Sequence, residues 1–254
     1  MGGDLSGVLA KLRRAEEHRE AFDDLVAEFA AGEPYTILTE YDPRTGWHTL
    51  RWHVLREPPL EELALVFGDL ISNLRTSLDY LVWQLVLAAG NRPGRRTGFP
   101  VVRRAKDWEV QSRAALQGVA PAWVAEVEAR QPYHRPERPA LHPLAILEHV
   151  NNINKHRFLP VAALSAERLD VLIDLRPAAG EPIESRDFLD RPIAPGGEAA
   201  RFRVASGVML DVTVNQAPRF RVSFDDGLGY DWHPLELVEW VRETIVRFEP
   251  AFRV

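Results

Sequence analysis

Two short runs of polar residues at helical spacing carry the side chains in this sequence that could do chemistry. In SNLRTSLDY, Arg75 and Asp79 are four residues apart, so their side chains can meet on one face of a helix. In EHVNNINKHRFL, His149, Asn152 and His156 recur at steps of three and four. If two helices pack with these runs facing each other, they would enclose a pocket for a phosphate group or a nucleotide.

A structural explanation competes with this hypothesis for both runs. An exposed Arg75–Asp79 pair would add only a few tenths of a kcal/mol to stability, although a buried pair would need further hydrogen bonds. Lys155, His156 and Arg157 fall in the last predicted turn of their helix. Cations there complement the helix dipole by roughly 0.3 to 1 kcal/mol each. On composition alone, the second run is therefore most simply a helix end.

Other chemistries find less support. The chain has no cysteine, which excludes a disulfide, a thiolate metal site and a cysteine nucleophile, and it contains no P-loop, GxSxG elbow or HExxH pair. His149 and His156, seven residues apart, could bind a metal. Glu148 or Asp79 would complete that set, but histidines so spaced more often belong to a hydrogen-bonded structure. The sequence therefore predicts neither a metal nor a cofactor.

The helices that must position these runs follow from apolar periodicity. Apolar residues step by three or four from Leu60 to Ala89, which predicts a long central helix ended by Gly90. Its core-facing stripe is predicted to consist of Leu63, Phe67, Leu70, Leu74, Leu78, Leu81 and Leu85. A helix over 141–158 carries the second run, and further helices are expected over 5–31, 106–117, 121–130 and 234–248.

Strands are expected in two places. The β-rich runs 35–40 and 47–55 flank the turn-forming DPRTG and predict a hairpin, and the final third has strand-like runs over 169–175, 200–204, 208–214 and 220–224. The sequence therefore predicts an α+β fold: a helical bundle around a long central helix, with an N-terminal β-hairpin and a C-terminal antiparallel β-rich part closed by a helix. Residues 1–165 would form the mainly helical domain with the inserted hairpin, and 166–254 the β-rich part, as two domains or as one compact unit.

Composition narrows the class of protein. The 254 residues are 46% hydrophobic, which is enough for a substantial core, and neither a secretory signal nor a membrane-spanning run is predicted. Together with the absence of cysteine, this predicts a soluble cytoplasmic protein. The formal charge of −6 argues against broad electrostatic binding to nucleic acid. Residues 91–113 nevertheless hold seven Lys or Arg against two acids, a run that is more often a solvated loop than a phosphate-binding patch.

Four short motifs in order resemble a family of bacterial proteins of unknown function. They are GDLISNLRTSLDYLVWQLV, TGFPV, QPY and NNINKHRFL, and the match covers about residues 55–160. The family pattern runs near GE-x-x-HNLRSALDHL, FPI, QPY and N-x-x-DKHR. This chain departs from it at Ser72 and Tyr80, where the family often has His, and at Asn154, where it often has Asp.

The family pattern R-x-x-x-D-H is distantly similar to the R-x4-6-H signature of HEPN domains, helical bundles that include metal-independent ribonucleases. The resemblance implies that Arg75 positions a phosphate, and HEPN active sites often lie across a homodimer interface. The position of the acid/base histidine is Tyr80 in this chain. Because a tyrosine with a pKa near 10 is a poor base at neutral pH, His156 would have to take that role.

Two functional hypotheses of different classes follow. In the first, the protein is a HEPN-like module that binds a nucleotide or RNA and cleaves RNA without a metal. Its catalytic residues would be Arg75 and His156, and its ligand-binding residues Asn73, Asp79, Tyr80, Asn152, Lys155 and Arg157. In the second, the same residues form a structural polar network, and the protein is a non-enzymatic interaction or assembly protein that makes contacts through its β-rich part.

Overall fold

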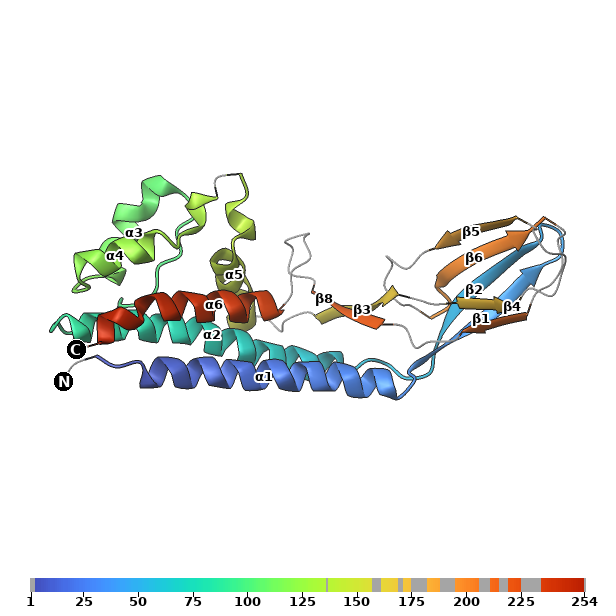
Figure 1. Cartoon of the computed structure of the whole chain (residues 1–254), viewed down its shortest axis with the longest axis horizontal. Helices are drawn as coiled ribbons and strands as arrows, with labels where there is room; N and C mark the ends of the chain where they lie inside the picture. Colours follow the sequence, from blue (N-terminus) through green and yellow to red (C-terminus); the bar gives the residue numbers. More distant parts are fainter. Residues whose placement is uncertain are drawn as a thin grey trace. The chain divides into compact units, whose positions relative to one another are not determined.

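A computed structural model gives the fold, and it is mixed α+β as predicted (Figure 1). The residues that it describes are 3–135, 137–156, 161–168, 171–174, 182–187, 195–205, 211–214, 219–224 and 234–253. The helices are α1 (Ser6–Ala31), α2 (Leu60–Ala88), α3 (Trp108–Ala115), α4 (Pro121–Glu128), α5 (Pro143–His156) and α6 (Pro234–Phe248). Short 3-10 turns lie at Ala105–Asp107, Pro132–His134, Pro139–Leu141 and Glu249–Phe252.

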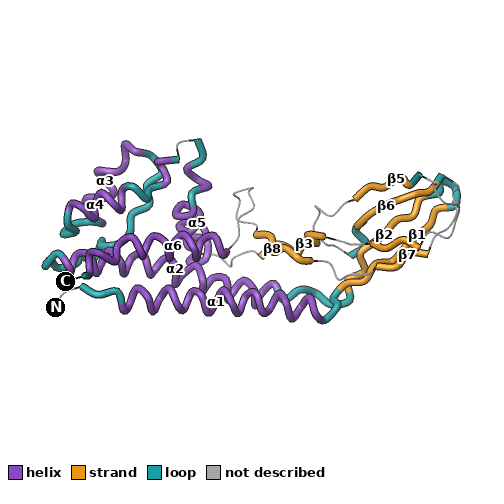
Figure 2. Tube along the Cα trace, viewed as in Figure 1, coloured by secondary structure: helices purple, strands orange, loops and turns teal. Residues whose placement is uncertain are grey.

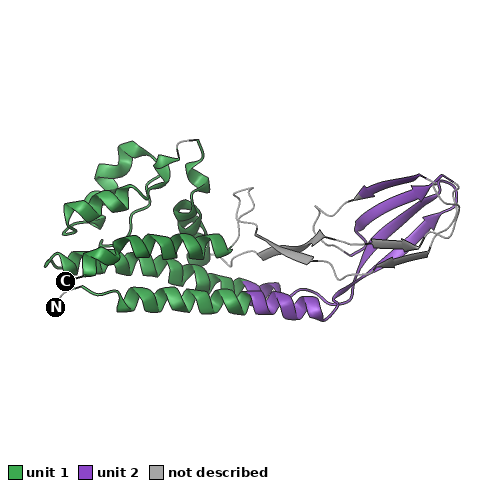
Figure 3. Ribbon diagram, in the orientation of Figure 1, with its two compact units in different colours: residues 1–22, 64–160, 225–254 green, residues 23–63, 161–224 purple. Residues whose placement is uncertain are grey.

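The chain forms two compact units (Figure 3). Unit 1 consists of residues 1–22, 64–160 and 225–254, and unit 2 of residues 23–63 and 161–224. Each unit is therefore assembled from segments that alternate along the chain, whereas the sequence-based prediction divides the chain into two consecutive stretches.

In unit 1, α1, α2 and α6 lie side by side (Figure 1). The Phe22 ring of α1 is 5.8 Å from the Phe67 ring of α2, and Arg242 Nε of α6 donates to Glu16 Oε1 of α1 at 3.1 Å. All seven residues of the predicted α2 stripe are buried, and so are Ile71, Val82 and Val86. The apolar face of α2 is thus wider than one stripe, as expected of a central helix with neighbours on several sides.

No helix within the described residues has the length and apolar character that crossing a membrane would require.

Unit 2 contains an antiparallel four-stranded sheet in the order β1-β2-β6-β5 (Figure 2). Its strands are β1 (Tyr35–Asp42), β2 (Trp47–Val54), β5 (Ile183–Asp187) and β6 (Glu198–Val204). Two further antiparallel pairs are β3 (Val161–Arg168) with β8 (Arg219–Phe224), and β4 (Val171–Asp174) with β7 (Asp211–Val214). The predicted hairpin is confirmed as β1 and β2, whereas β3 and β5 were not predicted.

The hairpin turn shows how the sequence sets this sheet. The Asp42 carboxylate accepts from the Arg44 N–H at 2.9 Å and from the Thr45 hydroxyl at 2.9 Å, and the Asp42 carbonyl accepts from the Gly46 N–H at 2.8 Å. Gly46 has a φ of 71°, which is a left-handed conformation that glycine adopts without strain. The strands bury Leu50, Trp52, Ala199, Ala200, Phe202 and Val204 in one hydrophobic cluster.

Candidate functional site

The predicted pair of Arg75 and Asp79 forms on α2, where Arg75 Nη2 lies 3.0 Å from Asp79 Oδ1. The same Nη2 atom donates to the Phe99 carbonyl oxygen at 2.7 Å, and the Phe99 N–H donates to Asp79 Oδ1 at 2.9 Å. The two side chains are 15% and 39% exposed. The pair therefore satisfies both backbone groups of Phe99, and it fixes the TGFPV segment against α2.

Gly98 explains how the segment can come so close. A Cβ atom at this position would lie 2.8 Å from Asp79 Oδ1, which is closer than Cβ atoms pack in proteins. The ring of the next residue, Phe99, is buried, so the segment is held by packing as well as by hydrogen bonds. The sequence motif TGFPV therefore meets the motif that contains Arg75 and Asp79.

Helix α5 packs against α2 through Asn154. Its Nδ2 atom donates to the Gly68 carbonyl oxygen at 3.0 Å and to Ser72 Oγ at 3.0 Å. A Cβ on Gly68 would come within 2.5 Å of Asn154 Oδ1, so glycine is what allows this approach. Ser72 and Asn154, two of the three positions at which this chain departs from the pattern that it resembles, are thus hydrogen-bonded to each other.

Glu148 on α5 is the carboxyl group that faces this part of α2. Burial raises its pKa, and the negative charge of Asp79 adds to the rise. The positive charges of Arg75, Arg103 and Lys155 act in the opposite direction. Arg75 of α2, Arg103 of the loop over residues 91–104, here called the basic loop, and Lys155 of α5 therefore all act on one half-buried carboxyl group. A carboxyl with a raised pKa can hold a proton closer to neutral pH than an ordinary glutamate can.

The guanidinium of Arg75 retains an unused donor. Its Nη1 atom is buried and has no hydrogen-bond partner within the described part of the chain. Buried donors are normally satisfied, so an unpaired one marks either strain or a place for a ligand. The arrangement could bind an anion at Arg75, with Glu148 as a neighbouring group that gains or loses a proton.

The structure separates two predicted site residues from this group. Asn73 Oδ1 accepts from Lys11 Nζ of α1 at 3.2 Å. The Tyr80 ring lies 3.5 Å from the point where a Cβ on Gly7 of α1 would be, and the residue is 44% exposed. Asn73 and Tyr80 therefore belong to the face of α2 that meets α1.

On α5, the predicted residues Asn152 and Lys155 are exposed, and the charge of Lys155 reaches Glu148. His156 is the last residue of α5, but its side chain lies outside the described residues, as does Arg157. Sequence reasoning considered Glu148 only as a metal ligand. Its spacing of seven residues from Lys155, which is two helical turns, could have placed it on the same face.

The QPY motif joins the same part of the fold. The buried Gln131 side chain accepts from the Val102 N–H at 2.9 Å and donates to the Val127 carbonyl oxygen at 3.0 Å. Tyr133 donates to Glu128 Oε1 at 2.7 Å, and burial together with that bond raises the pKa of the tyrosine. QPY thus holds Val102, the residue that follows TGFPV. Hydrogen bonds to this one short segment therefore link three of the motifs.

The cations of residues 91–113 form no comparable cluster within the described part of unit 1. All seven cations of residues 91–113 are exposed, and Arg104 pairs with Asp107 at 2.6 Å. Within the described residues, no three His, Asp or Glu side chains are grouped so as to hold a metal ion.

Comparisons of this chain with protein-family models, with curated proteins and with solved structures give no match. The functional argument therefore rests on the geometry of unit 1.

Proposed function

We propose that the protein binds a phosphate-bearing ligand, a nucleotide or RNA, on the face formed by α2 and α5, with Arg75 as the residue that contacts the phosphate. The observation that carries this proposal is the buried Nη1 atom of Arg75, which has no partner within the described residues. Arginine is suited to the role because its planar guanidinium matches the oxygens of a phosphate group.

The surrounding charges support the same ligand class. Arg75, Arg103 and Lys155 lie around Glu148, together with Asp79. Asp79 is already engaged by Arg75 and by the Phe99 N–H. If Glu148 takes up a proton when an anion binds, the balance around the site becomes more positive without any movement of the backbone. Glu148 would thus supply the proton exchange that the HEPN resemblance assigns to a histidine.

Binding is tested by isothermal titration calorimetry with ATP and with a short single-stranded RNA. Because Arg75→Ala would also release Phe99, we use Arg75→Lys, which keeps the positive charge and loses the planar set of guanidinium donors. Arg103→Gln and Lys155→Gln, both at exposed positions, are measured beside it. We expect Arg75→Lys to weaken binding at least tenfold and the other two by several-fold. Arg92→Gln, an exposed cation of the same basic loop, is the matched control and should bind as the wild type does.

The same samples are assayed for RNA cleavage in EDTA, with Glu148→Gln and His156→Ala added to the set. Cleavage that survives EDTA and falls in Arg75→Lys and Glu148→Gln would support a metal-independent ribonuclease with Glu148 as the group that exchanges the proton. A fall in Arg75→Lys and His156→Ala, with Glu148→Gln unchanged, would assign that exchange to His156. Absence of binding by the wild type, or equal binding by the wild type and all three α2–α5 variants, would remove the proposal.

A structural network is the second candidate, and a specific observation favours it. Arg75 and Asp79 already hold both backbone groups of Phe99, and Asn154 holds α5 to Gly68 and Ser72. In that case Arg75→Lys would lower the melting temperature, and no variant would change a binding signal.

A further inference from the structure

A tryptophan surrounded by arginines lies on one face of the four-stranded sheet of unit 2. The guanidinium carbons of Arg201 and Arg203 on β6 are each 4.9 Å from the centroid of the Trp47 ring on β2, and that of Arg186 on β5 is 5.8 Å away. Arg186 pairs with Arg201 in the strand register, and Glu184 with Arg203, so these side chains share a face of the sheet. We call Trp47, Arg186, Arg201 and Arg203 the arginine cluster.

The cluster has more positive charge than its neighbours neutralise. Glu184 Oε2 accepts from Arg203 Nε at 2.7 Å, and Arg186 lies 3.9 Å from the same carboxylate group. The Nε atom of Arg201 is buried and has no hydrogen-bond partner within the described part of the chain. Asp42, the partner of Trp47 in the strand register, is used by the hairpin turn and by Arg44. Within the described residues, the cluster of three arginines is paired with one carboxylate, that of Glu184.

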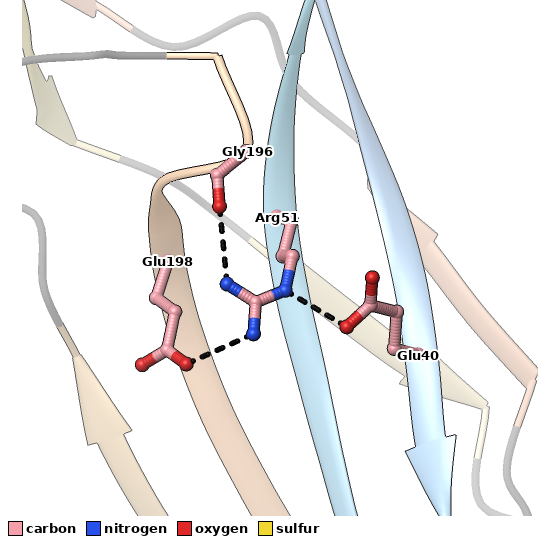
Figure 4. A network of polar contacts seen from close by, with 4 residues as sticks. All are labelled: Glu40, Arg51, Gly196 and Glu198. Atoms are coloured by element: carbon pink, nitrogen blue, oxygen red, sulfur yellow. Dashed lines mark hydrogen bonds and ion pairs between the residues drawn. The ribbon is translucent and has the colours of Figure 1, made fainter.

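Arg51 in the same sheet shows what a satisfied arginine looks like (Figure 4). Its Nε donates to Glu40 at 2.8 Å, its Nη2 to Glu198 at 3.2 Å and its Nη1 to the Gly196 carbonyl oxygen at 3.0 Å. Every nitrogen of that guanidinium has an acceptor. The contrast with Arg201 indicates that the surplus donors of the arginine cluster are particular to this end of the sheet.

A cleft lies beside the cluster. Its volume is about 720 Å³, and it is lined by the hairpin turn (residues 43–46), the start of β5 (182–184) and the end of β6 (203–205). Arg203 belongs both to this lining and to the arginine cluster. Sites for small molecules are typically clefts of about 300–1,000 Å³ with a few charged groups at fixed positions. The cleft therefore has the volume of such a site, and Arg203 joins it to the cluster.

We propose that this end of the sheet binds a small phosphate monoester, with its phosphate on Arg201 and Arg203 and the rest of the molecule in the cleft. A guanidinium stacked on an aromatic ring keeps the N–H groups of its edge available, and these match two phosphate oxygens. A phosphate monoester carries about −1.5 to −2 charges at neutral pH, so it matches the excess of arginines over acids in the cluster better than a carboxylate, which carries one charge, does. The site is separate from Arg75, and its argument does not depend on the proposed function.

The test is calorimetric titration of the full chain with phenyl phosphate and with benzoate, which share a ring and differ in the charge of the anionic group. We expect phenyl phosphate to bind at least ten times more tightly than benzoate. Arg201→Gln and Arg203→Gln should each weaken the binding of phenyl phosphate at least tenfold. The affinity of Arg201→Lys should lie between those of the wild type and Arg201→Gln. Arg51→Gln, which removes a fully paired arginine of the same sheet, is the control and should leave the affinity unchanged.

The proposal fails if the wild type does not bind phenyl phosphate, if the two probes bind with equal affinity, or if Arg51→Gln loses as much affinity as the cluster variants do. Circular dichroism melts establish which variants are folded. If Arg201→Gln does not fold, Arg186→Gln on the exposed edge strand replaces it, with an expected several-fold loss of affinity.

Loss of phenyl phosphate binding in Arg75→Lys but not in Arg201→Gln would assign the binding to the α2–α5 face instead. Much tighter binding of a single-stranded oligonucleotide, lost in Arg201→Gln, would replace the small molecule by a nucleic acid.

Discussion

Arg75 donates a hydrogen bond of 2.7 Å to the carbonyl oxygen of Phe99, a residue 24 positions further along the chain. Because Asp79, the ion-pair partner of Arg75, accepts from the N–H of the same residue, one pair on α2 replaces both backbone partners that Phe99 would have in a strand. Phe99 in turn buries its ring. The pair is therefore a fixed element of unit 1, and a ligand at Arg75 would use the donor that Phe99 leaves free.

Gly98 should be intolerant of a side chain for this reason. Gly98→Ala places a Cβ 2.8 Å from Asp79 Oδ1, so either Asp79 or the TGFPV segment must move. We expect a loss of about 1–3 kcal/mol in the free energy of unfolding, as for overpacking of a tight site. Urea denaturation measures it.

Gly94→Ala is the matched control for this prediction. It lies in the same loop, and a Cβ there would have nothing within 4 Å. We expect a change within about 0.5 kcal/mol, as for other surface substitutions. Equal stability of the two variants would show that the approach of Gly98 to Asp79 is not constrained as described.

Gly68 and Asn154 should be energetically coupled. Gly68→Ala alone brings a Cβ within 2.5 Å of Asn154 Oδ1 and should destabilise the protein, although alanine is the better helix former by about 1 kcal/mol. In an Asn154→Ala background the obstacle is gone, so the same substitution should become neutral or stabilising. A double-mutant cycle by chemical denaturation measures this change of sign.

The control for the cycle is Gly7→Ala in α1, where the nearest atom to the added Cβ would be a Tyr80 ring carbon at 3.5 Å, an ordinary contact. It should stabilise the protein by about 0.5–1 kcal/mol in both backgrounds. Additive effects of Gly68→Ala and Asn154→Ala would contradict the contact between α2 and α5.

The sequence predicts those features of the structure that depend on residues close together in the chain, and it does not predict those that depend on packing between distant segments. The apolar spacing of α2 predicts its bounds within one residue, and the Arg75–Asp79 pair follows from a spacing of four. The partner of the pair could not be predicted in the same way, because Phe99 reaches it through the path of a loop. Glu148 was missed as a neighbour of Arg75 for a similar reason, since packing between helices decides it.

Strand β5 illustrates a different limit. Its sequence, IESRD, has one apolar residue, and Ile183 itself is 43% exposed. An edge strand with no buried side lacks the alternation by which strands are recognised. The hairpin of β1 and β2 was predictable because its turn residues and its buried positions both have a local signature.

His142 should make the protein sensitive to acid. It is buried, its Nδ1 accepts from the Leu144 N–H at 3.2 Å, and its ring packs edge-on against Trp240. Burial lowers the pKa of His142 to about 4, with Arg135, His134 and Arg130 adding to the effect. The unfolded chain binds the proton from about pH 6.5 downward and the folded chain only near pH 4, so stability falls as the pH drops through this window.

The expected loss from this histidine is about 2 kcal/mol at pH 5 relative to pH 7.5. It is measured as the difference in pH dependence between the wild type and His142→Gln, which cannot take up a proton. The variant is expected to be less stable than the wild type at pH 7.5, because it loses the packing on Trp240. Its stability should fall less than that of the wild type when the pH is lowered to 5. Parallel curves for the two proteins between pH 7.5 and 5 would refute the assignment.

Glu148 should change the pH dependence of stability in the direction opposite to that of His142. Because burial raises its pKa, its contribution to stability is fully present below the pKa of the unfolded chain and is lost as the pH rises through the raised value. Glu148→Gln removes the cost of keeping a half-buried carboxylate charged. We therefore expect the variant to melt at a higher temperature than the wild type at pH 8, with a difference that shrinks toward pH 4.5. Glu109→Gln, at an exposed position of α3, should show no such trend.

Glu148 also connects stability with the proposed ligand. Binding of a phosphate near Arg75 should be accompanied by proton uptake at Glu148, because a second negative charge there raises the pKa of the carboxyl further. Affinity for ATP should then weaken as the pH rises from 6 to 8.5 in the wild type and should depend less on pH in Glu148→Gln, which is uncharged throughout. Calorimetry in two buffers of different ionisation enthalpy measures the protons taken up. Uptake that persists in Glu148→Gln would assign the proton to another group, and the proposed role of Glu148 would fail while phosphate binding at Arg75 could stand.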